Sequence, residues 1–200
     1  MVIYKQLITY VKDFLRDFNF RKKGENFILE KGNNLGIINF QKSRRSSQTD
    51  ILFTINVGVY LNSLSMFDYI NMLKTPVIDG CHWKDRINPI ASSKKESWWA
   101  IKNDTSLDEI YSKVRLALEC SALPQIEKFI VDANLEKAWL SGISGGLSEQ
   151  QRQLYTIVLL KKNGNENWLY MVEQLRNYSR GKSFETNIAE NIVKILSRNE

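Results

Sequence analysis

The sequence contains few of the residues from which most catalytic and metal sites are built. Among its 200 residues are one histidine, His82, and two cysteines, Cys81 and Cys120. A structural zinc site needs four Cys or His ligands, and this chain has three such residues in all. Two cysteines also give no disulfide framework. We therefore expect no metal centre, no cofactor and no catalytic residue, while a carboxylate-bound ion stays open.

Nucleotide-binding motifs and long apolar runs are also missing. The G-x-G-x-x-G fingerprint is absent, and the glycine-rich residues 141–146 lack the Lys-Ser/Thr ending of a phosphate loop. We interpret that segment as a hinge between two helices. The apolar runs are too short to cross a bilayer, and charged residues interrupt residues 1–18, which argues against a signal peptide. These absences predict a cytoplasmic protein without a membrane partner.

The composition is that of a globular protein with an uneven charge. Hydrophobic residues make up 43% and charged residues 25% of the chain, and the formal net charge is +6. Residues 1–104 contain 16 Lys and Arg against 10 Asp and Glu, while residues 105–200 contain 12 of each kind. The whole positive excess therefore lies in the first half. Basic residues gather there in three clusters, at residues 21–23, 42–45 and 94–95. Such clusters are typical of a solvated surface, and a phosphate-binding patch is the alternative.

Two runs in the first half predict neighbouring strands with one apolar and one polar face. In residues 51–60 one parity is apolar throughout: Ile51, Phe53, Ile55, Val57 and Val59. In the preceding run Ile38 and Phe40 alternate with polar residues. If the runs pair antiparallel with their apolar parities aligned, the other face of the sheet presents a polar set: Asn39, Gln41, Ser43, Thr54 and Asn56.

The order of the predicted elements indicates an α+β fold. An amphipathic helix over residues 4–18 comes first. Strands are predicted over residues 27–31, 35–43, 51–61 and 98–101. Consecutive strands without intervening helices favour an antiparallel sheet of about four strands, covered by the N-terminal helix. A short helix is predicted over residues 64–73, and residues 77–97 are interpreted mostly as loop.

Beyond residue 103 the apolar spacing becomes helical. Ser106 with Glu109, and Ser148 with Gln151, are the predicted capping boxes of two helices, and Pro124 is expected to restart a helix between them. Two more helices follow towards the C-terminus. We therefore expect residues 1–104 to form a sheet-containing region and residues 105–200 to form an all-helical extension packed on it as one compact unit.

A second candidate region lies around the single histidine. Residues 82–87 read HWKDRI, and residues 98–99 are tandem tryptophans. Such a mixture suits base stacking, but core packing is favoured, and one of Trp98 and Trp99 should be buried because adjacent strand residues point to opposite faces. The amides of Gln41 and Asn56 have an alternative too, since buried amides often hold an irregular segment against a sheet.

Five short motifs occur in an order that resembles one protein family. They are FRKKG at 20–24, NFQKS at 39–43, FTINVG at 53–58, HWKDRI at 82–87 and WW at 98–99. Over roughly the first 115 residues, a typical single-domain span, this order resembles bacterial proteins of the domain of unknown function 4304 family. The resemblance implies an α+β domain without an assigned activity, cofactor or substrate. It also implies a shared surface or scaffold made of six residues: Gln41, Ser43, Asn56, His82, Trp83 and Arg86.

Two hypotheses for the function remain. The preferred one is a non-enzymatic module that binds a protein or peptide partner through these six residues, as an immunity-like or accessory factor. The alternative is an enzyme or nucleic-acid-associated protein that acts on a phosphate-bearing ligand, with Lys42, Arg44 and Arg86 as anion contacts.

Overall fold

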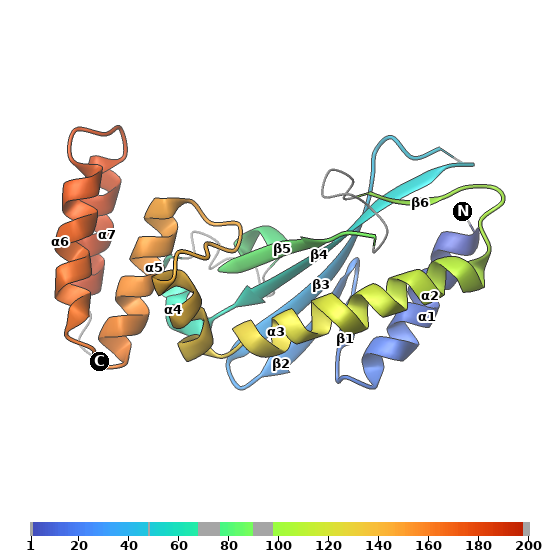
Figure 1. Cartoon of the computed structure of the whole chain (residues 1–200), viewed down its shortest axis with the longest axis horizontal. Helices are drawn as coiled ribbons and strands as arrows, with labels where there is room; N and C mark the ends of the chain where they lie inside the picture. Colours follow the sequence, from blue (N-terminus) through green and yellow to red (C-terminus); the bar gives the residue numbers. More distant parts are fainter. Residues whose placement is uncertain (1, 48, 68–76, 90–97, 198–200) are drawn as a thin grey trace.

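The structure, a computed structural model, describes residues 2–47, 49–67, 77–89 and 98–197. It has an α+β fold in which an antiparallel sheet is covered on one face by helices, and further helices extend beyond one end of the sheet (Figure 1). Within these ranges the sheet has six strands: β1 (Arg21–Lys23), β2 (Asn26–Lys31), β3 (Asn34–Lys42), β4 (Ile51–Tyr60), β5 (Trp83–Ile87) and β6 (Trp99–Ile101). The predicted fold class is confirmed.

The strands follow one another across the sheet in chain order. The order is β1-β2-β3-β4-β5, every pairing is antiparallel, and β6 pairs with β4 beyond the end of β5. Two strands escaped prediction. The three residues of β1 are basic and exposed, and β5 has Lys84, Asp85 and Arg86 between its buried ends. Both short strands lie at edges of the sheet, where charged side chains reach solvent, so neither shows the apolar alternation that predicts a strand. The interpretation of residues 77–97 as mostly loop is therefore wrong for Trp83–Ile87.

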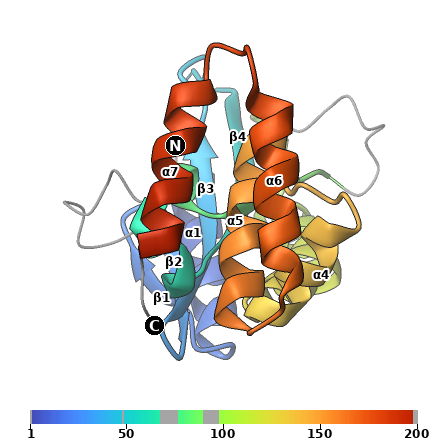
Figure 2. The ribbon, with the colours of Figure 1, turned by 90° about the vertical axis from the view of Figure 1, so that its left-hand side faces the viewer.

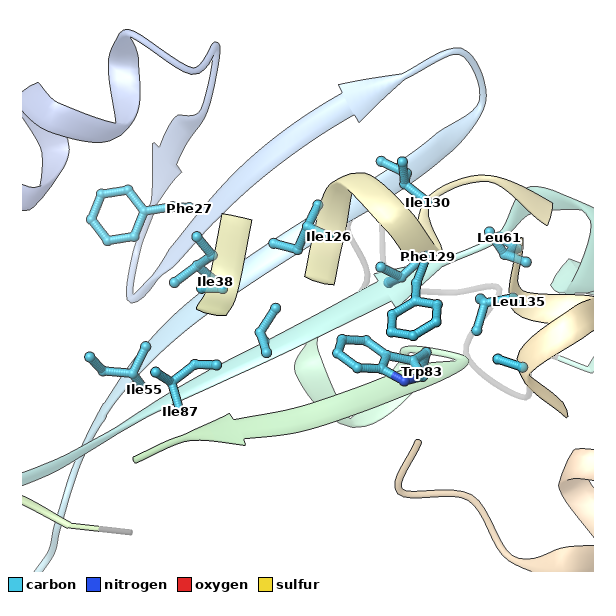
Figure 3. Packing of buried hydrophobic residues seen from close by; sticks show 14 of the residues in the cluster. Phe27, Ile38, Ile55, Leu61, Trp83, Ile87, Ile126, Phe129, Ile130 and Leu135 are labelled. Atoms are coloured by element: carbon cyan, nitrogen blue, oxygen red, sulfur yellow. The ribbon is translucent and has the colours of Figure 1, made fainter. Parts of the chain in front are cut away.

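The apolar parities of β3 and β4 face one layer of helices. Helix α1 (Val2–Arg16) buries Leu7, Val11 and Leu15, and Tyr4 of this helix packs edge-on against Phe53 at 5.4 Å between ring centroids. Figure 3 shows the same sheet face from close by, where Ile126 and Phe129 lie over Ile38 and Trp83. The predicted covering of the sheet by the N-terminal helix is thus one part of a larger helical layer.

The rest of that layer is one nearly continuous helix. It comprises α2 (Leu107–Ala117), the π-helical turn η3 (Leu118–Ala122) and α3 (Leu123–Phe129). The expected helix restart at Pro124 is confirmed, since α3 begins at Leu123 with Pro124 in its first turn, where proline is tolerated. The π-helical turn joins it to α2 without an intervening loop. Ser106 precedes α2 without a side-chain capping bond, so the first predicted capping box does not form.

The remaining helices form the end of the molecule away from α1. They are α4 (Asp132–Leu140), α5 (Glu149–Lys162), α6 (Asn167–Ser179) and α7 (Glu185–Ser197). Figure 2 shows α6 and α7 side by side in front of α5. The capping box predicted for α5 is confirmed, because Ser148 and Gln151 each accept a hydrogen bond from the other's backbone N–H. One hydrophobic cluster runs from Leu7 in α1 to Ile195 in α7.

Two short helical turns lie among the described residues between β4 and β5. The turn η1 (Asn62–Phe67) occupies the beginning of the short helix predicted over residues 64–73, and the rest of that prediction lies outside the described residues. The turn η2 (Ile78–Gly80) packs on β4, where Gly58 leaves room for Ile78 and Cys81: a Cβ on Gly58 would lie 2.7 Å from each side chain.

The glycine-rich residues 141–146 connect α4 with α5, as the hinge interpretation predicts. They also pack against β5, because the backbone N–H of Lys84 donates to the carbonyl oxygen of Gly145 at 2.8 Å. Gly145 has a φ of 56° and lies directly against the indole of Trp83, so a side chain at this position would collide with the ring. Glycine is therefore required at position 145 because of its left-handed backbone conformation and because the Trp83 ring leaves no room for a side chain.

We expect Gly145→Ala to lower the free energy of unfolding by about 2–4 kcal/mol, since the added methyl group must displace Trp83. Gly164→Ala is the matched control: Gly164 also has a left-handed φ, 67°, but a Cβ there meets no atom within 4 Å. Its cost should be about 1 kcal/mol, from backbone strain alone. Urea unfolding of both variants measures the difference, and equal losses would contradict the collision with Trp83.

A polar junction joins the sheet to the helices at its end. The Asp132 carboxylate, at the start of α4, accepts hydrogen bonds from Asn34 Nδ2 at 2.9 Å, Ser63 Oγ at 2.9 Å and Lys162 Nζ at 2.8 Å. Asn34 also donates to the carbonyl oxygen of Ile130, at 2.9 Å. Burial raises the pKa of Asp132, whereas the three hydrogen-bond donors together lower it by more. The pKa of this carboxyl therefore lies below its usual value.

Because the folded-state pKa of Asp132 is depressed, its ionised form stabilises the fold above the ordinary carboxyl pKa of about 3.9. That contribution is lost as the pH falls through the folded-state pKa. We expect Asp132→Asn to cost about 1–3 kcal/mol near neutral pH and less near pH 3, because below a pH of about 3.9 the unfolded wild-type chain takes up a proton at this carboxyl and the stabilisation declines. Urea unfolding at both pH values tests this, with the exposed Asp104→Asn as control; a cost independent of pH would refute it.

Candidate functional site

One row of side chains crosses five strands on the sheet face opposite helices α1, α2 and α3. In the strand registers, Lys23 lies opposite Asn26, Asn26 opposite Asn39, Asn39 opposite Asn56, and Asn56 opposite Arg86. Side chains directly opposite one another on neighbouring strands share a face. The row therefore has three asparagines in its centre and a cation at each end. We call this the amide row.

Hydrogen bonds connect the row from side chain to side chain. Asn39 Nδ2 donates to Asn26 Oδ1 at 2.7 Å, and Asn56 Nδ2 donates to Asn39 Oδ1 at 3.1 Å. Arg86 Nε then donates to Asn56 Oδ1 at 3.2 Å. Each amide thus orients the next one, and Arg86 is held over β4 rather than extending freely from the sheet edge.

The centre of the row is buried and its neighbours are exposed to different degrees. Asn39 and Asn56 are each 8% exposed, whereas Gln41 and Arg86 are exposed. Gln41 lies next to Asn39 on the same face, with Oε1 3.4 Å from Asn56 Nδ2, opposite the buried Thr54. This register confirms the predicted polar face for Asn39, Gln41, Thr54 and Asn56. The hydrogen bonds of the Asn56 amide join side chains of neighbouring strand residues, so they do not support the alternative in which this amide holds an irregular segment against the sheet.

The other predicted residues on β3 and just after it lie apart from one another. Ser43 is half-buried beyond the end of β3, where its Oγ accepts from the backbone N–H of Arg45 at 3.1 Å. Lys42 pairs with Phe53, whose side chain is in the core, so Lys42 has the parity of the helix-covered face. Arg44 is exposed in the turn that follows. The structure therefore does not bring Lys42, Arg44 and Arg86 together.

His82 lies in the core, 1% exposed, directly before the first residue of β5. Its Nδ1 accepts a hydrogen bond from the backbone N–H of Leu61 at 3.0 Å. Its ring packs against Tyr60 at 4.8 Å and Tyr155 of α5 at 5.1 Å between centroids. The imidazole therefore connects β4, β5 and α5, and it lies at the opposite end of β5 from Arg86.

Trp83 points to the opposite side of the sheet from Arg86. It is 4% exposed and packs against Phe129 of α3, with ring centroids 4.6 Å apart (Figure 3). Of the tandem tryptophans, Trp99 is buried and donates from Nε1 to the carbonyl oxygen of Ile87 at 3.0 Å, while Trp98 is 45% exposed. This confirms the expectation that one of the two is buried.

The two cysteines differ in exposure: Cys81 is buried and Cys120 is exposed. Burial raises the pKa of the Cys81 thiol to about 12, with smaller opposing effects from Lys84 and Asp79, so the thiolate is scarcely formed at neutral pH. Cys120 is exposed on η3. Within the described ranges, no group of three or more His, Cys, Asp or Glu side chains could hold a metal ion.

The part of the chain that forms the sheet and most of its helical layer matches the model of a known protein family. The family model for the Domain of unknown function (DUF4304) matches residues 11–128. The chain belongs to this family. The DUF4304 region contains all six strands and ends next to the last residue of α3, and therefore includes the whole amide row. No match was found among curated proteins or among solved structures. In the described parts of the chain, no helix is both long and apolar enough to cross a membrane.

Two members of the row in the DUF4304 region escaped sequence prediction. Lys23 was part of a basic cluster, and Asn26 preceded the predicted strand by one residue, so neither had a visible place in the sheet. The parity of β2 offered a signal for Asn26: continuing the alternation back from Ile28 places it on the face of Asn39. Lys23 offered none, because β1 is a three-residue exposed strand.

We expect the centre of the row to stabilise the fold and its exposed neighbour to contribute little. Asn56→Ala should cost about 1–3 kcal/mol, because the buried Asn39 Oδ1 loses its donor. Gln41→Ala, on the same face, should stay within about 0.5 kcal/mol of the wild type. Chemical unfolding of the two variants is the measurement; similar losses for both would show that Gln41 is a structural residue as well.

Proposed function

We propose that the protein is a non-enzymatic binding module whose amide row, together with Gln41, contacts an acidic segment of a protein or peptide partner. The observation that supports this most is the sequence of groups in the row, in which Lys23 and Arg86 flank three connected asparagines. In this proposal the protein is an immunity-like or accessory factor, and the two partners meet in the bacterial cytoplasm.

The dimensions of the row suit a segment rather than a single small anion. Neighbouring strands lie about 4.8 Å apart, so five strands separate the two cations by about 19 Å. Carboxylates some residues apart on a bound segment would approach Lys23 and Arg86, and its backbone would contact the exposed Gln41. Arg is common in such interfaces because its planar guanidinium binds carboxylates with two hydrogen bonds.

The rigidity of the row also favours binding. Arg86 Nε already donates to Asn56 Oδ1, and the two central amides behind it, Asn56 and Asn39, are buried. A side chain held in place loses less conformational entropy when a partner binds than one that extends freely into solvent. His82 and Trp83 are buried and would not contact the partner themselves. In this proposal their role is to position β5, the strand that contains Arg86.

A phosphate-bearing ligand, including single-stranded nucleic acid, is the second candidate. The shared face of Lys23 and Arg86 favours it, since phosphates would also approach two cations on one surface. The position of Lys42 is against it, because that residue has the parity of the other face. We therefore place an acidic segment first.

Binding of fluorescent probes to the whole chain tests both candidates. The probes are a glutamate-rich peptide and an oligothymidine of similar length, followed by fluorescence anisotropy at low and high salt. We expect the peptide to bind and the double variant Gln41→Ala/Arg86→Ala to weaken it about tenfold. The matched control is Gln174→Ala/Arg180→Ala, two exposed positions of the same residue types at α6, which should change binding less than about twofold.

The remaining outcomes are distinct. Salt-dependent binding of oligothymidine without binding of the peptide would replace the proposal by the phosphate-bearing ligand. If neither probe binds and the double variant at Gln41 and Arg86 melts several degrees below the wild type, the row is a structural network and the proposal is wrong.

A further inference from the structure

A groove with an apolar floor and an acidic rim lies between the end of α1 and the turn from η3 into α3. It encloses about 790 Å³ and has β2 as its third wall. Its apolar lining comes from three parts of the chain: Phe20, Leu29, Leu123, Ile126 and Ile130. Leu29 and Leu123 are half-buried, so apolar surface is accessible from the groove.

The rim of this groove is negatively charged although the protein is basic. Asp17, Glu30, Glu119 and Glu127 line it, against one cation, Lys31. Glu119 is paired with Arg115 at 2.9 Å. Among the described residues, the carboxylates of Asp17 and Glu127 have no hydrogen-bond or ion-pair partner, and both residues are exposed. The rim therefore has a local charge opposite in sign to the net charge of the whole chain, which is +6.

The groove continues along the interface of α1 with α2. A second hollow of about 460 Å³ shares three lining residues with it, Asp17, Phe18 and Glu119. Phe18, at the shared boundary, is 43% exposed, and so is Tyr10 at the far end of the second hollow. The combined surface is elongated, and it presents aromatic and aliphatic groups beside the unpaired carboxylates of Asp17 and Glu127. The two arginines of the second hollow are each paired with a carboxylate, Arg16 with Asp13 and Arg115 with Glu119.

We propose that this groove binds a basic amphipathic segment of a protein partner, with apolar side chains on its floor and Lys or Arg side chains at its rim. Charge complementarity selects this occupant, because unpaired carboxylates beside apolar surface favour cations carried on an apolar segment and repel acidic ones. The site is separate from the amide row, which lies on the other face of the sheet and has cations at its ends. The groove therefore requires a basic partner segment, whereas the amide row requires an acidic one.

The test uses the whole chain and a synthetic helical peptide of about four turns, with leucine on one face and lysine on the other. Anisotropy of the labelled peptide reports binding. We expect Asp17→Asn/Glu127→Gln to reduce its affinity roughly 5- to 10-fold, because two uncompensated carboxylates are removed. The control Glu166→Gln/Glu190→Gln removes the same charge from exposed positions on the α6–α7 side and should change affinity less than about twofold.

A second peptide and the amide-row variant distinguish binding in the groove from non-specific attraction between charges. Replacing every leucine of the peptide by serine should weaken binding about tenfold, because the apolar floor then has no counterpart. Gln41→Ala/Arg86→Ala should leave binding of the leucine–lysine peptide unchanged. Equal effects of the two charge variants, or equal binding of the serine peptide, would show non-specific attraction and overturn the proposal. A dimer in sedimentation that Asp17→Asn/Glu127→Gln dissolves would also overturn it, since a second copy would then occupy the groove.

Discussion

The register between β3 and β4 is the constraint on which the rest of the structure depends. It sets Phe40 opposite Ile55 on the helix-covered face and Asn39 opposite Asn56 on the other. Successive residues of a strand point to opposite faces, so a shift of one residue would bury the amides against α1 and α3 and expose the aromatic core. Burial of the apolar parity therefore fixes the amide row at the same time, and β2 and β5 extend the row to Asn26 and Arg86 from their own registers.

The helices beyond the DUF4304 region complete the fold around β5. His82 contacts Tyr155 of α5, Trp83 lies against Gly145, and Lys84 donates a backbone hydrogen bond to the same glycine. At the other side of this junction, Asp132 is bonded to Asn34 of β3 and Ser63 of η1. The strand that presents Arg86 is thus held at one end by the helical part of the chain, which links that part physically to the candidate site.

The molecule presents two surfaces of opposite character on different sides of its sheet. The amide row is polar and bounded by cations, and its central groups are already hydrogen-bonded to one another. The groove beside α1 and α3 is apolar with a rim of carboxylates. The single imidazole and one of the two thiols are buried in the core. The two surfaces are therefore the places at which we propose that partners bind.

The sequence by itself determined the features that repeat with a local period. Helical spacing predicted α1 and the C-terminal helices, alternation predicted the two faces of β3 and β4, and Ser148 with Gln151 predicted the start of α5. The tertiary structure alone decided the positions of β1, β5, His82 and Trp83. A short edge strand can be charged throughout because solvent satisfies its side chains, and an imidazole or indole is buried only when distant segments such as α3 and α5 pack over it. Local patterns report what a segment can bury, whereas the choice of covering segment depends on contacts between residues far apart in the chain.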